Sequence, residues 1–153
     1  MPYEVTEPQI PLHDENRFYY GDLIDIVEEE GNYGKQLKWF IHIDDEEYED
    51  DNGVTQDKIT WAYCSPKLTT HENNKFRKYV KGLTGKEPAN GEMFDERHWT
   101  KQFYEDNPSE DPEKLTGRKQ PWRVALMFEH AKKKSDGTPY DKVTVIASEE
   151  AVR

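Results

Sequence analysis

The sequence predicts a mostly β, α+β fold of five strands, with one helix between the third and the fourth strand. Apolar and polar residues alternate in several short segments, which is typical of half-buried strands. One segment instead repeats its apolar residues at helical spacing. The chain has no internal repeat and no regular alternation of strands and helices, which argues against a parallel, doubly wound sheet.

The bulk composition predicts one compact domain with long polar loops. A chain of 153 residues can bury a core, although its hydrophobic content is only 33% and its charged content is 35%. Such values lean toward disorder, but 4 Trp, 9 Tyr and 6 Phe are far more aromatics than a disordered chain carries. We therefore expect a folded core.

The net charge of −11 argues against a protein that binds polyanions by bulk charge alone. It does not exclude a local basic groove, because salt screens distant charges beyond about 10 Å. Cys64 is the only cysteine, which excludes an internal disulfide and a multi-thiolate metal site. With no apolar run of about 18–20 residues and no signal-peptide pattern, we expect a cytosolic, soluble protein without a membrane partner.

The first part of the chain predicts an extended arm followed by two strands. Residues 1–15 contain three prolines and no periodicity, so we expect an N-terminal arm before a domain at 16–148 and a tail at 149–153. Two apolar segments then flank the turn sequence "EEEGNYG". In the second segment, residues 37–43, two sets of side chains alternate. One set is expected to face the core, and the other is expected to lie on the outer face of the strand. The inward set is Leu37, Trp39, Ile41 and Ile43, and the outward set is Lys38, Phe40 and His42.

An acidic stretch and a third strand follow. The run "DDEEYEDD" at 44–51 carries seven acids in eight positions, which predicts a solvated acidic loop at 44–57. The segment "DKITWAYC" alternates Ile59, Trp61 and Tyr63 with Thr60, Ala62 and Cys64, and either set can face the core. Because large aromatic residues usually serve the core, burial is favoured for Trp39 and Trp61.

The clearest helix begins near Thr69, which forms a capping-box pattern with Glu72. Its predicted buried face is Phe76, Tyr79, Val80 and Leu83, and Gly82 or Gly85 is expected to end it.

An irregular insertion at 86–120 follows the helix. Within it Asp95 is expected to cap a short helix that carries Trp99 and Phe103. "WRVALMFEH" and "YDKVTVIAS" then predict two strands around a turn at Asp136–Gly137.

Five strands with one helix between the third and fourth is the order of the OB-fold, a five-stranded Greek-key barrel, with a generic α+β sheet as the alternative. The chain resembles small phage and bacterial OB-fold proteins of the single-stranded-DNA-binding type over roughly residues 18–147. The likeness lies in Gly21–Asp22, "YGKQLKWFIHI", "FRKYVKGLTGK", "LTGRKQPWRVALMF" and "DGTPYDKVTVI". The acidic stretch at 44–52 and the insertion at 95–114 are longer and more acidic than that pattern.

The resemblance implies an OB-fold and binding of single-stranded DNA in replication or recombination. It also implies a location in the cytoplasm of a bacterial or phage-infected cell.

No pattern in the sequence predicts an enzyme, a metal site or a cofactor. "GLTGK" at 82–86 imitates a phosphate-binding loop, but Val80 and Glu87 stand where that motif needs Gly and Ser or Thr. "YEDDNG" fails the EF-hand pattern because Tyr48 and Ile59 would be its first and twelfth ligands. The five histidines show no metal-ligand spacing.

Binding of single-stranded nucleic acid, DNA or RNA, requires aromatic faces for stacking and cations for the phosphates. In an OB-fold such groups lie on the second and third strands and on the loops beside them. Phe40 is the main stacking candidate. The predicted nucleic-acid-binding residues are Tyr33, Lys35, Lys38, Phe40, His42, Trp61, Tyr63, Lys132, Lys133, Lys134 and Tyr140.

Two other surfaces stay open as alternatives. Lys75, Lys78 and Lys81 form a basic stripe on the helix, opposite its buried face. The acidic residues of 44–51 could imitate DNA phosphates or bind a basic protein or a replication protein, which would make the chain an interaction or inhibitor module. The sequence leaves the oligomeric state open.

Overall fold

The structure is a computed structural model that describes residues 2–3 and 12–153. Five antiparallel strands form one sheet in the order β3-β2-β1-β4-β5. The strands are β1 (Tyr19–Gly31), β2 (Gly34–Glu49), β3 (Thr55–Cys64), β4 (Arg123–Lys132) and β5 (Pro139–Ser148). The mostly β, α+β prediction is therefore confirmed.

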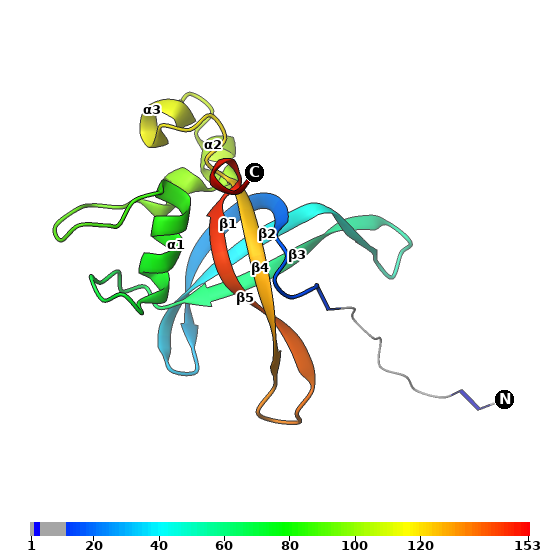
Figure 1. The fold of residues 1–153 in the computed structure, drawn as a ribbon. Coiled ribbons are helices and arrows are strands. Elements are labelled where there is room, and N and C mark those ends of the chain that lie inside the picture. Colours follow the sequence, from blue (N-terminus) through cyan, green and yellow to red (C-terminus); the bar gives the residue numbers. More distant parts are fainter. Residues whose placement is uncertain (1, 4–11) are drawn as a thin grey trace.

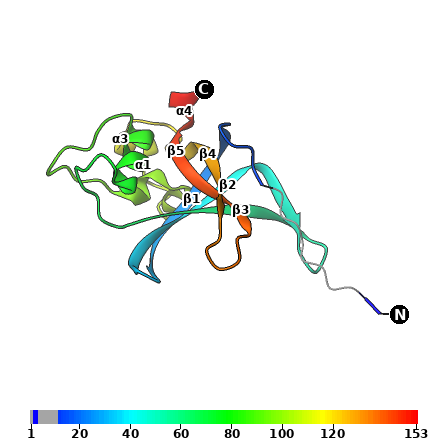
Figure 2. The same cartoon turned by 60° about the horizontal axis from the view of Figure 1, so that its bottom comes forward.

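The sheet is strongly curved but is not closed into a barrel (Figures 1 and 2). Its edge strands are β3 and β5, and no backbone ladder joins them within the described residues. The predicted five-stranded barrel is therefore not closed, and the OB-fold itself stays a prediction. β1 is the central strand. It pairs with β2 along most of its length and with β4 only through Tyr19–Asp22.

Helix α1 (Lys75–Thr84) lies between β3 and β4 in the chain, as expected, and packs against β5. Phe76, Tyr79, Val80 and Leu83 are buried, which confirms the predicted face, and Gly85 ends the helix in the left-handed conformation with φ +80°.

The predicted capping box is wrong. Asn74 caps helix α1, with its side chain accepting a hydrogen bond from the Arg77 amide at 2.8 Å. Thr69 instead accepts from the His71 amide in the turn before the helix, at 3.2 Å. An Asn satisfies the first-turn amides as well as a Thr does, so the sequence pattern alone favours the wrong start.

The acidic loop expected at 44–57 is largely strand. β2 continues to Glu49 and pairs with the start of β3, with Glu47 opposite Asp57 and Glu49 opposite Thr55. The pairing is irregular between His42 and Glu47, where Asp45 has a φ of 64°. A projecting hairpin lets the backbone pair while the carboxylates stay in water, so strand structure and a high acid content are compatible.

Short helices replace the irregular insertion, so the expectation of a single helix is incomplete. They are η1 (Glu96–Trp99), α2 (Lys101–Asp106), α3 (Pro112–Thr116) and, at the C-terminus, α4 (Glu149–Val152). Asp95 caps η1, but η1 ends at Trp99, and Thr100 then caps α2. Trp99 and Phe103 therefore lie on two elements, with Trp99 buried and Phe103 half-buried.

Residues 12–15 run along the sheet, whereas residues 1 and 4–11 of the expected arm lie outside the described residues. The His13 ring stacks on Phe128 at 4.2 Å between centroids. His13 Nδ1 lies 2.6 Å from Asp141 on β5, and Nε2 lies 2.7 Å from Glu46 on β2. His13 thus joins edge strand β5 to the acidic end of β2, two strands that are not neighbours in the sheet.

The core lies between the inner face of the sheet and α1, and Trp39 is at its centre, fully buried. Its ring packs against Tyr79 at 5.1 Å and Phe76 at 6.2 Å between centroids. Gly82 permits α1 to approach β5 closely, because a Cβ there would meet the Ile146 carbonyl oxygen at 2.1 Å. Over residues 2–3 and 12–153, no helix has the length and apolar character needed to cross a membrane.

Candidate functional site

The outer face of β2 carries the predicted side chains. Leu37, Trp39, Ile41 and Ile43 are buried, and the residues between them are half-buried on the opposite face. The predicted alternation is confirmed, so Lys38, Phe40 and His42 share the outer face.

The outer face of β3 carries two exposed aromatic rings. Trp61 is 52% exposed and Tyr63 is 38% exposed, while the alternate residues Ala62 and Cys64 are buried. The expected burial of Trp61 is therefore wrong, whereas that of Trp39 is confirmed. Ala62 pairs with Trp39, whose large ring already fills the inner space, so small residues fit beside it and the aromatics turn outward.

These side chains form one surface, called here the aromatic platform: Lys38, Phe40, Trp61 and Tyr63. Lys38 pairs with Tyr63, and Phe40 pairs with Trp61, across the two antiparallel strands. The Lys38 ammonium lies 4.0 Å from the Trp61 ring centroid, 5.3 Å from that of Phe40 and 5.8 Å from that of Tyr63. Among the described residues, Lys38 has no carboxylate partner. The platform therefore offers flat apolar faces beside one unpaired cation.

Two predicted site residues next to the platform have protein partners. His42 Nε2 lies 3.1 Å from the Glu46 carbonyl oxygen and 3.6 Å from an Asp57 carboxylate oxygen. Lys35 lies 3.5 Å from Glu28 on β1. Both side chains are thus less available to a ligand than Lys38.

The remaining predicted residues lie on two hairpins. Tyr33, at the β1–β2 turn, is fully exposed, and Lys132, Lys133, Lys134 and Tyr140 are exposed on the β4–β5 hairpin. The turn predicted at Asp136–Gly137 is confirmed by the positive φ of Gly137. Both hairpin tips project on the same side of the molecule, whereas the β2–β3 tip lies at the other end of β2 (Figures 1 and 2).

Lys75 on α1 and Lys142 on β5 lie close together, which the sequence does not predict. The pKa of Lys75 is lowered. Burial of its ammonium group is the largest cause, and the nearby charge of Lys142 on β5 is the next. No salt bridge joins either lysine to a carboxylate within the described part of the chain. Lys142 stands on a strand and Lys75 on a helix, so no local pattern in the sequence could connect them.

The predicted basic stripe on α1 is interrupted. Lys81 and Arg77 both bind Glu87, at 2.8 Å and 2.7 Å. These contacts hold the pKa of the Glu87 carboxyl below its ordinary value, with the hydrogen bond from Lys81 as the largest cause. Of the stripe, Lys75 and Lys78 stay without a carboxylate partner among the residues described.

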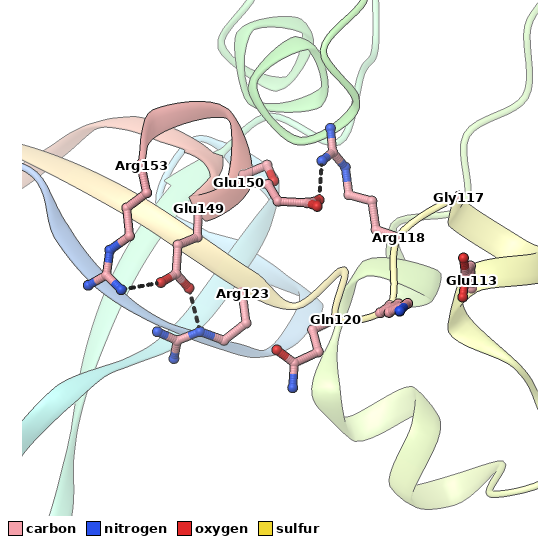
Figure 3. Close-up of a pocket in the computed structure, with 10 residues that line it drawn as sticks. Glu113, Gly117, Arg118, Gln120, Arg123, Glu149, Glu150 and Arg153 are labelled. Atoms are coloured by element: carbon pink, nitrogen blue, oxygen red, sulfur yellow. Dashed lines mark hydrogen bonds and ion pairs between the residues drawn. The ribbon is translucent and has the colours of Figure 1, made fainter.

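A pocket of about 620 Å³ lies elsewhere, between α4, α3 and the start of β4 (Figure 3). Its arginines are already bound to carboxylates: Arg123 to Glu149 at 2.6 Å and Arg118 to Glu150 at 2.7 Å. Arg123 also holds Asp44 at 2.7 Å, and its hydrogen bond lowers the pKa of that carboxyl. The pair of Arg123 with Glu149 joins α4 to β4, the pair of Arg118 with Glu150 joins it to the segment before β4, and these arginines are therefore not free for a ligand.

Comparison with models of known protein families gives no match, and comparison with curated proteins gives no significant match. The site is therefore argued from its own geometry.

Proposed function

We propose that this protein binds single-stranded DNA by stacking bases on the aromatic platform and contacting phosphates with nearby lysines. The observation that carries the proposal is that Trp61 and Tyr63 stand exposed beside Phe40, with Lys38 over all three rings. Contiguous exposed apolar surface of this kind often marks the place where a ligand or a partner binds. Each stacked base contributes about 1–3 kcal/mol of binding free energy.

We also propose that the sheet is an OB-fold opened between β3 and β5. The strand order β3-β2-β1-β4-β5 leaves those two strands at the edges, and the OB-fold is a partly open five-stranded Greek-key barrel. The position of α1 between β3 and β4 in the chain agrees with this order. OB-folds bind oligonucleotides on the face of their second and third strands, which is where the platform lies. The resemblance to phage and bacterial single-stranded-DNA-binding proteins supports the same proposal.

The distribution of charge agrees with a local anion-binding surface on an acidic protein. The cations without a carboxylate partner in the described residues include Lys38, the Lys75–Lys142 pair and the exposed lysines of the β4–β5 hairpin. The acidic end of the β2–β3 hairpin lies at the opposite end of β2 from the β1–β2 turn. Because salt screens charges beyond about 10 Å, these acids do not cancel the attraction of a phosphate to Lys38.

The projecting β2–β3 hairpin favours one second candidate function. Glu47, Tyr48 and Glu49 are exposed at its end, which suits contact with a basic protein. On that alternative the platform would be an accessory surface.

The test is a tryptophan-fluorescence titration with an unstructured oligonucleotide at two salt concentrations. Trp39 and Trp99 are buried and Trp122 is half-buried, so quenching by a stacked base reports mainly on Trp61. We expect saturable quenching that weakens as salt rises, and a Trp61→Phe variant that binds with much less quenching. Absence of binding at low salt by both fluorescence and anisotropy would overturn the proposal and favour the protein-interaction alternative.

A further inference from the structure

A β-bulge in β1 places an acidic residue at the edge of the aromatic platform. The register of β1 against β2 shifts between Leu23 and Asp25, so that Asp25 pairs with Phe40. Paired residues in antiparallel strands point to the same face of the sheet. Asp25 therefore lies on the outer face next to Phe40, and Val27 lies there opposite Lys38. Bulges commonly redirect a side chain beside a functional site.

The Asp25 carboxylate is oriented and still has a free acceptor. Its Oδ1 accepts a hydrogen bond from the Ile26 amide at 2.9 Å. Its Oδ2 has no donor, and the side chain no cation, among the residues that the structure describes. The next acids along β1 differ, because Glu28 lies 3.5 Å from Lys35 and Glu29 accepts from Gln36 at 2.8 Å. Asp25 is thus the acid of this strand that is available at the platform.

We propose that Asp25 gives the platform a preference for bases with an exocyclic amino group, cytosine above all, over thymine. This inference rests on the proposed function. A base stacked on Phe40 presents its edge to the strand beside it, which here carries Asp25. The cytosine N4 amino group donates to a carboxylate, whereas thymine presents the O4 carbonyl oxygen at the same position, which a carboxylate repels. The Asp25 carboxylate also repels phosphates, so the phosphate backbone of the bound DNA passes on the side of the lysines.

The test compares labelled homo-oligonucleotides of deoxycytidine and thymidine by fluorescence anisotropy at pH 7.5, where the cytidine strand stays unstructured. Both are pyrimidines of similar stacking area that differ in the base edge and in the C5 methyl group of thymine, so the pyrimidin-2-one strand described below is needed to assign the difference to the amino group. We expect roughly fivefold tighter binding of the cytidine strand, near the lower limit for one base-edge contact because the site is open to water. Asp25→Asn should abolish or reverse the ratio, since its amide keeps an acceptor for the Ile26 amide and can donate to thymine O4.

The matched control is Glu30→Gln, which removes one negative charge from the same strand near its exposed end. It should change both affinities alike and leave their ratio unaltered. A control on the ligand side needs no variant: a strand of pyrimidin-2-one deoxynucleosides lacks the C4 amino group and should lose the cytidine advantage.

Each outcome separates the inference from the proposed function. If the wild-type protein binds both strands equally, the base preference is overturned and single-strand binding stands. If the cytidine preference survives in Asp25→Asn or with the pyrimidin-2-one strand, Asp25 does not read the amino group. If neither strand binds, the proposed function itself is overturned.

Discussion

The Lys38 ammonium on β2 lies 4.0 Å from the centroid of the Trp61 ring on β3. A cation over an exposed indole stabilises the pair by about 0.5–1 kcal/mol and holds both side chains in place. The ring is therefore held on the outer face before any ligand arrives. On the proposed function, a base that stacks there would bring its phosphate near Lys38.

Trp61→Ala should weaken single-strand binding by roughly 5- to 150-fold, corresponding to the loss of one stacked base at about 1–3 kcal/mol. Trp61 is more than half exposed, so the free energy of unfolding should fall by only about 0.5–1 kcal/mol, mainly through the lost contact with Lys38. The measurement is anisotropy titration together with urea denaturation.

The control for this variant is Tyr48→Ala, which removes a ring that is 53% exposed, against 52% for Trp61, from the acidic end of the same sheet. Its affinity should stay at the wild-type value. Equal losses from both variants would show that the platform is not the stacking site.

The two strands of the platform show how far alternation in a sequence can be read. On β2 the inward set consists of three aliphatic residues and Trp39, against Lys38, Phe40 and His42, so the faces are unambiguous. On β3 both sets are compatible with a core, and the aromatic set was the better candidate by size. The choice is made by tertiary packing: Trp39, Phe76 and Tyr79 already fill the space over Ala62.

Contacts between distant segments were beyond sequence reasoning for the same reason. The buried face of α1 follows from its spacing, whereas Gly82 and Gly85 were both possible ends and only the left-handed conformation of Gly85 in the structure decides between them. In contrast, His13 contacts Glu46 and Asp141, which follow it in the chain by 33 and 128 positions. The bulge that directs Asp25 toward Phe40 depends on the pairing of β1 and likewise has no local signal.

Lys142→Ala should raise the pKa of Lys75 toward its ordinary value, because it removes the neighbouring charge that helps to lower that pKa. The pKa should stay somewhat low, since burial of the Lys75 ammonium is the larger cause. A pH titration of the lysine side-chain carbons by NMR measures both effects. An unchanged Lys75 pKa would show that the two charges do not interact.

If the Lys75–Lys142 pair contacts a phosphate, Lys142→Ala should also reduce the dependence of binding on salt by about 0.7 in the slope of log K against log salt. Lys114→Ala is the control, because Lys114 is exposed on α3 and has no salt bridge within the described residues. Equal changes in slope for both variants would show that the bound DNA does not contact Lys142.

Cys64 should react slowly with alkylating reagents in the native protein. Burial raises the pKa of its thiol to about 11, even though the Trp39 indole donates a hydrogen bond to its Sγ at 3.3 Å. At pH 8 such a pKa leaves roughly one thiol in a thousand ionised, and the thiolate is the reactive form. Iodoacetamide labelling, followed by mass spectrometry, should be fast only in denaturant; rapid native labelling would contradict the burial.

The raised pKa of Cys64 also makes the free energy of unfolding depend on pH. A thiol that holds its proton more tightly in the folded state adds stability below the unfolded pKa near 9.0, and this is lost as the pH rises toward about 11. In Cys64→Ala the fall in unfolding free energy between pH 9 and 11 should be smaller. Urea denaturation across this range measures it, and parallel curves for the two proteins would contradict the assignment.

His13→Ala should lower the free energy of unfolding by about 2–4 kcal/mol, because it removes a stacked ring and leaves two carboxylates without their shared partner. The side chain lies 2.6 Å from Asp141 and 2.7 Å from Glu46 and is largely buried. His71→Ala is the control, since His71 is exposed in the turn before α1. Urea denaturation of both variants gives the comparison.

A second substitution separates stacking from the polar contacts of His13. His13→Phe can keep the ring on Phe128 but offers no nitrogen to Asp141 or Glu46, so it should restore only part of the lost stability. Full recovery would mean that the ring alone holds residues 12–15 on the sheet. Partial recovery fits a clamp in which both carboxylates matter, because one imidazole then joins β5 to the acidic end of β2, while no ladder joins the edge strands β3 and β5 in the described part of the chain.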